Sequence, residues 1–326
     1  MHATTATTRR QLLALAAGAA VIPTAVLAQP VRTVRVIVNT SAGAGLDGIV
    51  RAMQPGLSQT LGASVVIDNQ AGASGLIGLQ TLARAPADGT TIGFASSNLV
   101  IFPSVLKSVP FDVTADFTPI AIVGEIPLVV VANPARIPAT NAKEFAAILK
   151  SKPDGFNYAS SGSGTILHLT SEMLLEEIGV KVRHIPYKGS TPMLTDTVGG
   201  QVDFTTAALP AALPHIRSGA LRAIGVCTAK RTEIAPEIPT FVEQGFPKFV
   251  VDSWHSILGP KGMAAPLIRK FHDAVVAALK DSAVRDALAK QGVVIRLQTP
   301  EEAQATIRAE LAKYASLVKR IGLQPQ

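Results

Sequence analysis

The sequence predicts an α/β protein built on two sheets. Three observations favour this class: short runs rich in β-branched residues alternate with longer helical stretches, glycine-rich turns follow several of these runs, and the alternation starts afresh after residues 128–132. The 326 residues are 48% hydrophobic and 16% charged, which is enough to form the core of one large or two medium domains.

The first series of elements predicts a βαβαβ unit. We expect strands at Val34–Val38, Val65–Asp68 and Thr91–Ala95, and helices at Leu46–Leu61 and Ser74–Ala85. Alternation of this kind needs crossover helices on both faces of a largely parallel sheet, whose strands read as continuous apolar runs.

A second series predicts a separate sheet. Its expected strands and helices are Leu128–Ala132, Asn141–Lys150, Tyr158–Ser160, Thr165–Ile178, Val182–Ile185, Ser190–Val198, Val202–Thr206 and Leu221–Cys227. A proline-rich passage at 236–247 then breaks the pattern. The strand Trp254–Leu258, two terminal helices and the strand Val293–Leu297 between them are expected to return the chain to the first sheet.

The final helix has the clearest start signal. Thr299 is the expected N-cap, Pro300 suits the first turn, and Glu302 completes a capping box. Its apolar face is predicted to pack on the core, and consists of Ile307, Leu311, Tyr314, Val318 and Ile321.

The N-terminus reads as a cleavable export signal. Arg9 and Arg10 precede an apolar run to Ile22, and small residues end at Ala28, so we expect residues 1–28 to be a signal peptide and the mature protein to be periplasmic. The paired arginines suit a twin-arginine signal, and an ordinary secretory signal fits equally well. The apolar run is shorter than the roughly 20 residues that span a bilayer.

Composition narrows the possible functions. Cys227 is the only cysteine, so neither an intrachain disulfide nor a cysteine-based zinc site can form. The formal net charge is +7, and losing Arg9 and Arg10 leaves +5. Because the basic residues are scattered, we expect no binding to nucleic acid, although a moderately basic surface helps to steer an anionic ligand.

Four turns that follow predicted strands are rich in Gly, Ser, Thr or Asn. They are Ser41–Asp47, Asn69–Gly75, Ser96–Asn98 and Ser160–Thr165. The first turn of a helix has unpaired N–H groups and the positive end of the helix dipole, so a carboxylate can bind there without a lysine. In open α/β sheets ligands lie beyond the carboxyl ends of the strands, where all four turns are expected. Any single turn of this kind is more often only a tight connection, and the four together favour an anion site.

An alternative is a dinucleotide-binding turn. Gly43-x-Gly45-x-x-Gly48 follows a strand and opens a helix, and Asp68 ends the next strand about twenty residues later, as in nicotinamide-dependent oxidoreductases. The same strand-to-glycine-turn pattern recurs at Gly72–Gly75 and in the second series, which suits two facing anion grips better than one pyrophosphate cradle.

Catalytic patterns are weak, so we expect no enzyme activity, no cofactor and no metal. The serines at 161 and 163 lack a Gly-x-Ser-x-Gly frame, and the six histidines show no His-Glu-x-x-His pattern or close pair with metal spacing.

The turns and later motifs resemble the tripartite tricarboxylate transporter substrate-binding proteins, also called Bordetella uptake gene receptors. The resemblance covers nearly all of the mature chain. Its motifs are Gly43–Arg51, in which Ala44 stands where the family usually has Gly, Gly72–Gly78, Tyr158–Glu172, Ile185–Ser190, Gly199–Asp203, Ile238–Pro247 and Ser253–Gly262, of which the last departs somewhat from the family pattern.

This resemblance implies a type II periplasmic binding protein of two doubly wound lobes with a ligand cleft between them. Residues 29–129 would begin lobe one, 130–249 would form lobe two, and 250–326 would complete lobe one. The implied ligand is a small carboxylate, such as a di- or tricarboxylate, an amino acid or an aromatic acid. A membrane permease of the tripartite family or a sensor kinase is the implied partner, and a monomer is the expected state.

The resemblance also implies a set of ligand-binding residues, with Asp203 supporting a loop of lobe two. The set is Gly43, Ala44, Asp47, Ala73, Ser74, Ser97, Ser161, Gly164, Thr165, Asp203 and Ala208. We expect Thr165→Ala to weaken binding with little effect on folding, because it removes one hydroxyl. Gly75→Asp is expected to weaken binding further, because it places a fixed negative charge at a helix start.

Overall fold

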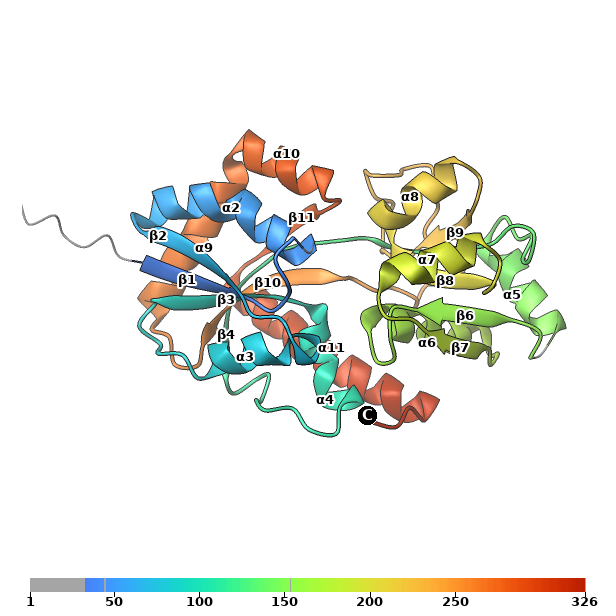
Figure 1. Ribbon diagram of the computed structural model, residues 1–326, viewed down its shortest axis with the longest axis horizontal. Coiled ribbons are helices and arrows are strands. Elements are labelled where there is room, and N and C mark those ends of the chain that lie inside the picture. The colour runs from blue at the N-terminus through green and yellow to red at the C-terminus, as the bar shows by residue number, and fades with distance from the viewer. Residues whose placement is uncertain (1–32, 44, 153, 326) are drawn as a thin grey trace, which may run out of the picture. The chain divides into compact units, whose positions relative to one another are not determined.

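The computed structural model describes residues 33–43, 45–152 and 154–325 (Figure 1). The expected signal peptide and Ala44 lie outside the described residues. Within these three ranges, no helix combines the length and the apolar character that crossing a bilayer requires.

Six strands form the first sheet, sheet A, in the order β11-β4-β10-β3-β1-β2. β1 pairs in parallel with both β2 and β3, whereas β10 is antiparallel to β3 and to β4, and β11 is antiparallel to β4. The strands are β1 (Thr33–Val38), β2 (Ser64–Asn69), β3 (Thr91–Ser96), β4 (Phe117–Glu125), β10 (Trp254–Pro260) and β11 (Val294–Gln298).

Five strands form the second sheet, sheet B, in the order β7-β6-β8-β5-β9. β6 is parallel to β7 and β8, and β5 runs antiparallel between β8 and β9. The strands are β5 (Leu128–Ala132), β6 (Asn157–Ser160), β7 (Arg183–Pro186), β8 (Phe204–Ala208) and β9 (Arg222–Val226). Sheet A therefore has two strands, β10 and β11, that run opposite to the other four, and sheet B has one such strand, β5.

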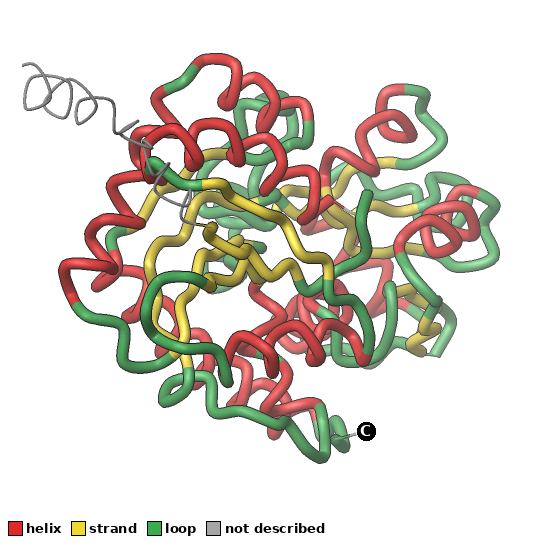
Figure 2. The backbone as a smooth tube through the Cα atoms, turned by 60° about the vertical axis from the view of Figure 1, so that its left-hand side comes forward, coloured by secondary structure: helices red, strands yellow, loops and turns green. Residues whose placement is uncertain are grey.

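Helices cover the sheets on both faces (Figures 1 and 2). In sheet A, Val36 and Val38 pack with α2 and α9, whereas Ile37 faces α3, as the alternation of side chains along a strand requires. The helices are α2 (Gly45–Leu61), α3 (Leu76–Ala83), α4 (Phe102–Val105), α5 (Ala142–Ser151), α6 (Ile166–Ile178), α7 (Ser190–Val198), α8 (Leu209–Arg217), α9 (Ala265–Lys280), α10 (Ser282–Lys290) and α11 (Pro300–Ile321), with 3-10 turns η1 (Ala73–Gly75) and η2 (Ser97–Val100).

The predicted α/β class and the order of most elements are confirmed, but the sequence patterns missed β4, α8 and the short helix α4, and gave one helix before β11 where the structure has α9 and α10. β4 contains Pro119 and Gly124, which interrupt an apolar run, yet β10 pairs along its whole length with two shifts of register. α8 has Pro210 in its first turn and Pro214 inside, and both residues read as loop signals in a sequence.

The capping box at the start of α11 is confirmed. Thr299 accepts a hydrogen bond from the main chain of Glu302, and the Glu302 carboxylate accepts one from the main chain of Thr299 at 2.9 Å. Ile307, Tyr314 and Val318 of the predicted face are buried, so this helix is attached to the core along its length.

Two partly buried carboxyl groups lie where the chain passes between the sheets. Glu125 ends β4, and Asp252 precedes β10. The main-chain N–H of Ile126 donates a hydrogen bond to the main-chain oxygen of Ser253 at 3.0 Å. Burial, together with the neighbouring Asp252 carboxylate, raises the pKa of Glu125 to about 7, although Arg296 lies 3.9 Å away. Burial also raises the pKa of Asp252. The two crossover connections are thus joined by a main-chain hydrogen bond. They also place two carboxyl groups so close together that ionising both is unfavourable.

Glu125→Gln is expected to change how stability depends on pH. A carboxyl whose pKa is raised in the folded state binds more protons there, so its contribution to stability is present below pH 4.5 and is lost as the pH rises through about 7. Glutamine does not titrate. The free energy of unfolding of the variant, measured by urea titration, should therefore rise relative to wild type between pH 5 and pH 8. A difference that stays constant across this range would contradict the expectation.

Candidate functional site

Three of the glycine-rich turns follow β1, β2 and β3, which are neighbouring parallel strands. The carboxyl ends of parallel strands meet at one edge of a sheet, so Ser41–Asp47, Asn69–Gly75 and Ser96–Asn98 gather there. The fourth turn, Ser160–Thr165, follows β6 of sheet B and opens α6. Ala208 ends β8, which is parallel to β6, so it lies at the same edge of sheet B as this fourth turn.

Asp47 ties the first turn to the second. This side chain is buried, with 2% of the residue exposed. Its carboxylate accepts hydrogen bonds from the Gly43 main chain at 2.8 Å, from Arg51 at 2.8 Å and from Asn69 at 3.0 Å. The hydrogen bond from Arg51 is the main reason that the pKa of Asp47 falls to about 2. Asp47 therefore holds the turn as a compensated ion, and the N–H of Gly43 is occupied by it.

The dinucleotide interpretation does not fit this geometry. A Cβ at Gly48 would meet the side chain of Gln291 on the neighbouring chain segment, whereas the third glycine of a dinucleotide motif allows its helix to pack closely on the strand. Asp68, which would bind a ribose, is paired with Arg35 and accepts a hydrogen bond from Gln70 at 2.9 Å. The acidic group that such a cofactor requires is already occupied.

The second turn has an unusual backbone. Ala73 has φ of +45°, a left-handed conformation that costs a non-glycine residue roughly 1–2 kcal/mol. Gly75 has φ of +98°, and a Cβ there would lie 2.9 Å from the main-chain oxygen of Asn39. Gly75→Asp is therefore unsuitable as a test of binding alone, because any side chain at this position is strained and collides with Asn39. The backbone of Ser74 lies in η1 between these two residues.

Two residues near these turns were not anticipated. Asn39 follows β1 directly and is 7% exposed, and its Oδ1 has no hydrogen-bond partner among the described residues. The predicted site residue Ser97 likewise has a buried hydroxyl without a hydrogen-bond partner among the described residues. Asn98 accepts a hydrogen bond from the main-chain N–H of Ile166 at 3.3 Å, so the third turn contacts the start of α6. The sequence signal that could have identified Asn39 is the polar pair Asn39-Thr40 directly after an apolar strand.

The fourth turn is held by hydroxyl groups. Thr165 donates to the main-chain oxygen of Gly162 at 2.8 Å and accepts from the N–H of His168 at 3.4 Å. The Ser161 hydroxyl donates to Thr165 at 3.3 Å. Thr165 is thus the N-cap of α6, and since losing such a cap costs about 1 kcal/mol, we now expect Thr165→Ala to lower stability as well as to weaken binding.

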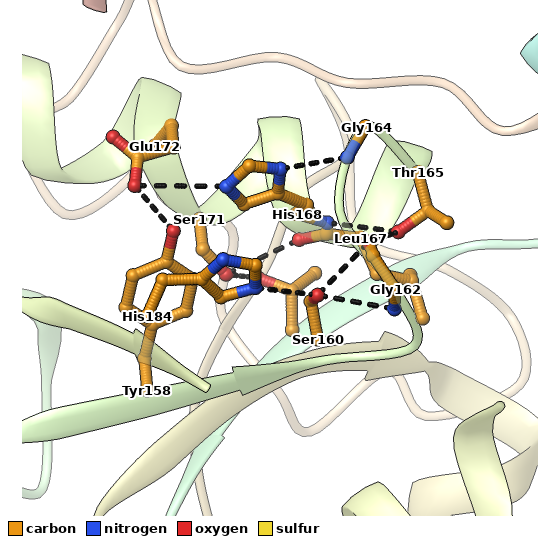
Figure 3. A network of polar contacts seen from close by, with 11 residues as sticks. Tyr158, Ser160, Gly162, Gly164, Thr165, Leu167, His168, Ser171, Glu172 and His184 are labelled. Carbon is orange, nitrogen blue, oxygen red and sulfur yellow. Dashed lines mark hydrogen bonds and ion pairs between the residues drawn. The ribbon is translucent and has the colours of Figure 1, made fainter. Parts of the chain in front are cut away.

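Behind this turn lies a network of buried polar and aromatic groups (Figure 3). The N–H of Gly164 donates to Nδ1 of His168 at 2.9 Å, so this predicted ligand-binding N–H already has a partner. The His168 ring stacks on His184 with centroids 4.0 Å apart, and Ser160 lies 2.7 Å from Nε2 of His184. The pKa of His168 falls to about 3 and that of His184 to about 4 because burial disfavours the charged rings.

Asp203 lies at the opposite end of β6 from the fourth turn. It is 1% exposed and accepts hydrogen bonds from Arg136 at 2.8 Å and from the main chain of Asn157 at 2.6 Å. Asn157 begins β6 and Ser160 ends it, so Asp203 fixes the entry of the strand whose exit carries the turn.

Asp47→Asn is expected to lower the free energy of unfolding by about 2 kcal/mol at pH 7, because the lowered pKa of Asp47 reports stabilisation of its ionised form. This contribution is present above pH 3.8 and is lost as the pH falls through about 2, so the two proteins should converge there. Asp273→Asn is the matched control, because that side chain is 79% exposed, and it should change stability by less than about 0.5 kcal/mol. Equal stability of Asp47→Asn and wild type at pH 7 would show that this carboxylate does not hold the turns.

Comparisons with known proteins agree with the two-sheet architecture. Residues 49–323 match the model of the tripartite tricarboxylate transporter family receptor. Protein BugT of Bordetella pertussis is 34% identical over 295 residues, covering 90% of each chain. The periplasmic binding protein BugD superposes with a TM-score of 0.75 at 32% identity, covering 91% of this chain and 100% of that one.

A further solved structure, MatC of Rhodopseudomonas palustris with bound malate, has a TM-score of 0.72 at 29% identity and covers 89% of this chain and 99% of its own. These structures share the two-lobe fold of type II periplasmic binding proteins, which the sequence motifs implied. The extent of the family match and the identity to BugT together show that the chain belongs to the tripartite tricarboxylate transporter receptor family.

Proposed function

We propose that this protein is a periplasmic receptor that binds a small carboxylate on the glycine-rich turns of its two sheets and catalyses no reaction. The observation that carries the proposal is the hydrogen bond between Asn98 of the third turn and Ile166 at the start of α6. It brings the carboxyl edge of sheet A next to the fourth turn, where oriented N–H groups and hydroxyls are concentrated. Donors from both sheets can then act on one ligand.

The charges around these turns favour a grip by neutral donors. The four turns contain no lysine and no arginine. Of the nearby acids, Asp47 is compensated by Arg51 and Asp68 by Arg35, so neither adds an uncompensated negative charge that would repel a carboxylate. The starts of α2 and α6 supply the positive end of the helix dipole instead.

The expected ligand-binding residues support this proposal in part by their positions. Gly43, Asp47, Ala73, Ser74 and Ser97 belong to the turns of sheet A, and Ser161, Gly164, Thr165 and Ala208 lie at the carboxyl edge of sheet B. The N–H groups of Gly43 and Gly164 already donate hydrogen bonds to Asp47 and His168, so we propose that these two glycines shape the turns. Contact with the ligand is then made by Ser97, Ser161 and the residues next to them.

Export and partners follow from the leader and from the family. The Arg9-Arg10 leader ending at Ala28 supports periplasmic location. We propose lobes of residues 29–129 with 250–326, and of 130–249. The membership of sheets A and B supports this division except at Leu128 and Val129, which begin β5 of sheet B. Delivery to a membrane permease of the tripartite type is the proposed use of the bound ligand, and a sensor kinase is the alternative partner. Relatives solved with adipate and with malate support the carboxylate class.

A thermal-shift panel tests the function. Malate, adipate, citrate, glutamate and benzoate are each titrated against the mature chain, and at least one should stabilise it by about 2.7 kcal/mol at 100 times its dissociation constant. NAD and NADP should have no effect. Stabilisation by a nicotinamide cofactor together with no response to any acid would overturn the receptor proposal.

Ser161→Ala then locates the site. Ser161 is only partly buried and its hydroxyl bonds Thr165, so its removal should leave folding almost unchanged while weakening binding of the best acid about tenfold. Ser151→Ala is the matched control, since that hydroxyl bonds the main chain of α5 in the same sheet-B half of the chain.

A further inference from the structure

We propose that His168 is a positioning residue, which sets the fourth turn for ligand binding by accepting the Gly164 N–H on Nδ1 of one fixed tautomer. The inference rests on the proposed function, since it names the group that shapes one half of that site. His168 is 3% exposed and lies beneath the turn (Figure 3). It is therefore placed to act through Gly164 and not by touching the ligand.

The hydrogen bond itself fixes the protonation of the ring. A backbone N–H can only donate, so Nδ1 of His168 must be the unprotonated nitrogen, 2.9 Å from the Gly164 nitrogen. The single proton of the neutral imidazole then lies on Nε2. A proton on Nδ1, in the other tautomer or in the charged ring, would face the N–H of Gly164 and abolish the bond.

The surroundings favour this tautomer. Oε1 of Glu172 lies 3.9 Å from Nε2 of His168, too far for a hydrogen bond but close enough to attract the Nε2 proton. The same oxygen accepts the hydroxyl of Tyr158, which holds the carboxyl group in place. Glu172, one turn further along α6, therefore lies on the Nε2 side of the ring, and Gly164 lies on the Nδ1 side.

The ring is also kept neutral and in one orientation. His184 stacks on His168 with an angle of 9° between the rings, and Tyr158 stacks on both. Two charged imidazoles at this separation would repel each other, and His168 is too deeply buried for water to compensate its charge. The aromatic stack therefore holds Nδ1 opposite Gly164 as an acceptor at neutral pH.

The turn needs such an anchor because its own backbone is permissive. Gly162 has φ of +142° and Gly164 has φ of +73°, conformations that glycine enters and leaves at little cost. A Cβ at Gly164 would lie 2.9 Å from Val105, so a stiffer residue does not fit there. Stiffness has to come from a partner, and the His168 bond supplies it beside Ser161 and Thr165.

Three substitutions separate the acceptor from the bulk of the ring. His168→Asn places an amide oxygen near the position of Nδ1, His168→Gln places it near Nε2, and His168→Leu removes it. Affinity is measured by calorimetry at pH 7 with whichever of malate, adipate, citrate, glutamate and benzoate binds wild type most tightly. We expect Leu and Gln to weaken binding about fivefold to tenfold and Asn to stay within about twofold. His272→Asn, on α9 of the other sheet, should bind as wild type.

Two readouts need no ligand. Nitrogen NMR of wild type should show the His168 proton on Nε2, and exchange of the Gly164 amide should be slow in wild type and His168→Asn but fast in His168→Leu. A proton on Nδ1, or full affinity and slow exchange in a folded His168→Leu protein, would overturn the proposal. The expected NMR and exchange results together with no binding of any acid would instead contradict the proposed function, and would leave His168 as a residue that holds the turn through Gly164 without a role in binding.

Discussion

Parallel pairing of β1 with both β2 and β3 is the constraint on which the site depends. Parallel neighbours have their carboxyl ends at one edge, so three turns that are distant in sequence must meet there. The pairing of β6 with β8 has the same effect in sheet B. Crossover helices that begin at these turns point their N-termini toward the same edge, which concentrates unpaired N–H groups without any basic side chain.

Glycine makes such turns possible and leaves them loose, and the protein fixes them by buried polar groups. Asp47 holds the first two turns through Gly43 and Asn69, and His168 holds the fourth through Gly164. In both cases a side chain on the helix reaches back to a glycine N–H four residues earlier. One anchor is a compensated anion and the other a neutral ring, so neither places an uncompensated charge beside a carboxylate ligand.

The sequence was sufficient for elements whose signals are local. The capping box of Thr299 and Glu302 and the helix from Gly45 to Leu61 depend on residues a few positions apart, and both were predicted closely. β4 could not be predicted, because Pro119 and Gly124 weaken its local pattern and only pairing with β10 and β11, which are distant in sequence, makes it a strand. α8 was missed for a related reason, since its two prolines are accepted at positions that only the folded chain reveals.

For the site, too, the local features were predictable and the long-range ones were not. The positions of the turns followed from strand-to-helix patterns, whereas the hydrogen-bond partner of each main-chain N–H did not. That Gly164 donates to His168, and that Asp203 lies at the far end of β6, depend on which side chains meet in space. Asn39 and Asn98 were missed because their roles require the neighbouring turn to be present.

We propose that neutral donors on the turns of both sheets hold the ligand, and a crystal structure of the protein with its best-binding acid would show whether they do. We expect carboxylate oxygens about 2.7–3.2 Å from backbone N–H or hydroxyl groups of turns from sheet A and sheet B, with no lysine or arginine at that distance. A carboxylate paired with a basic side chain such as Lys188, or bound away from these turns, would contradict it.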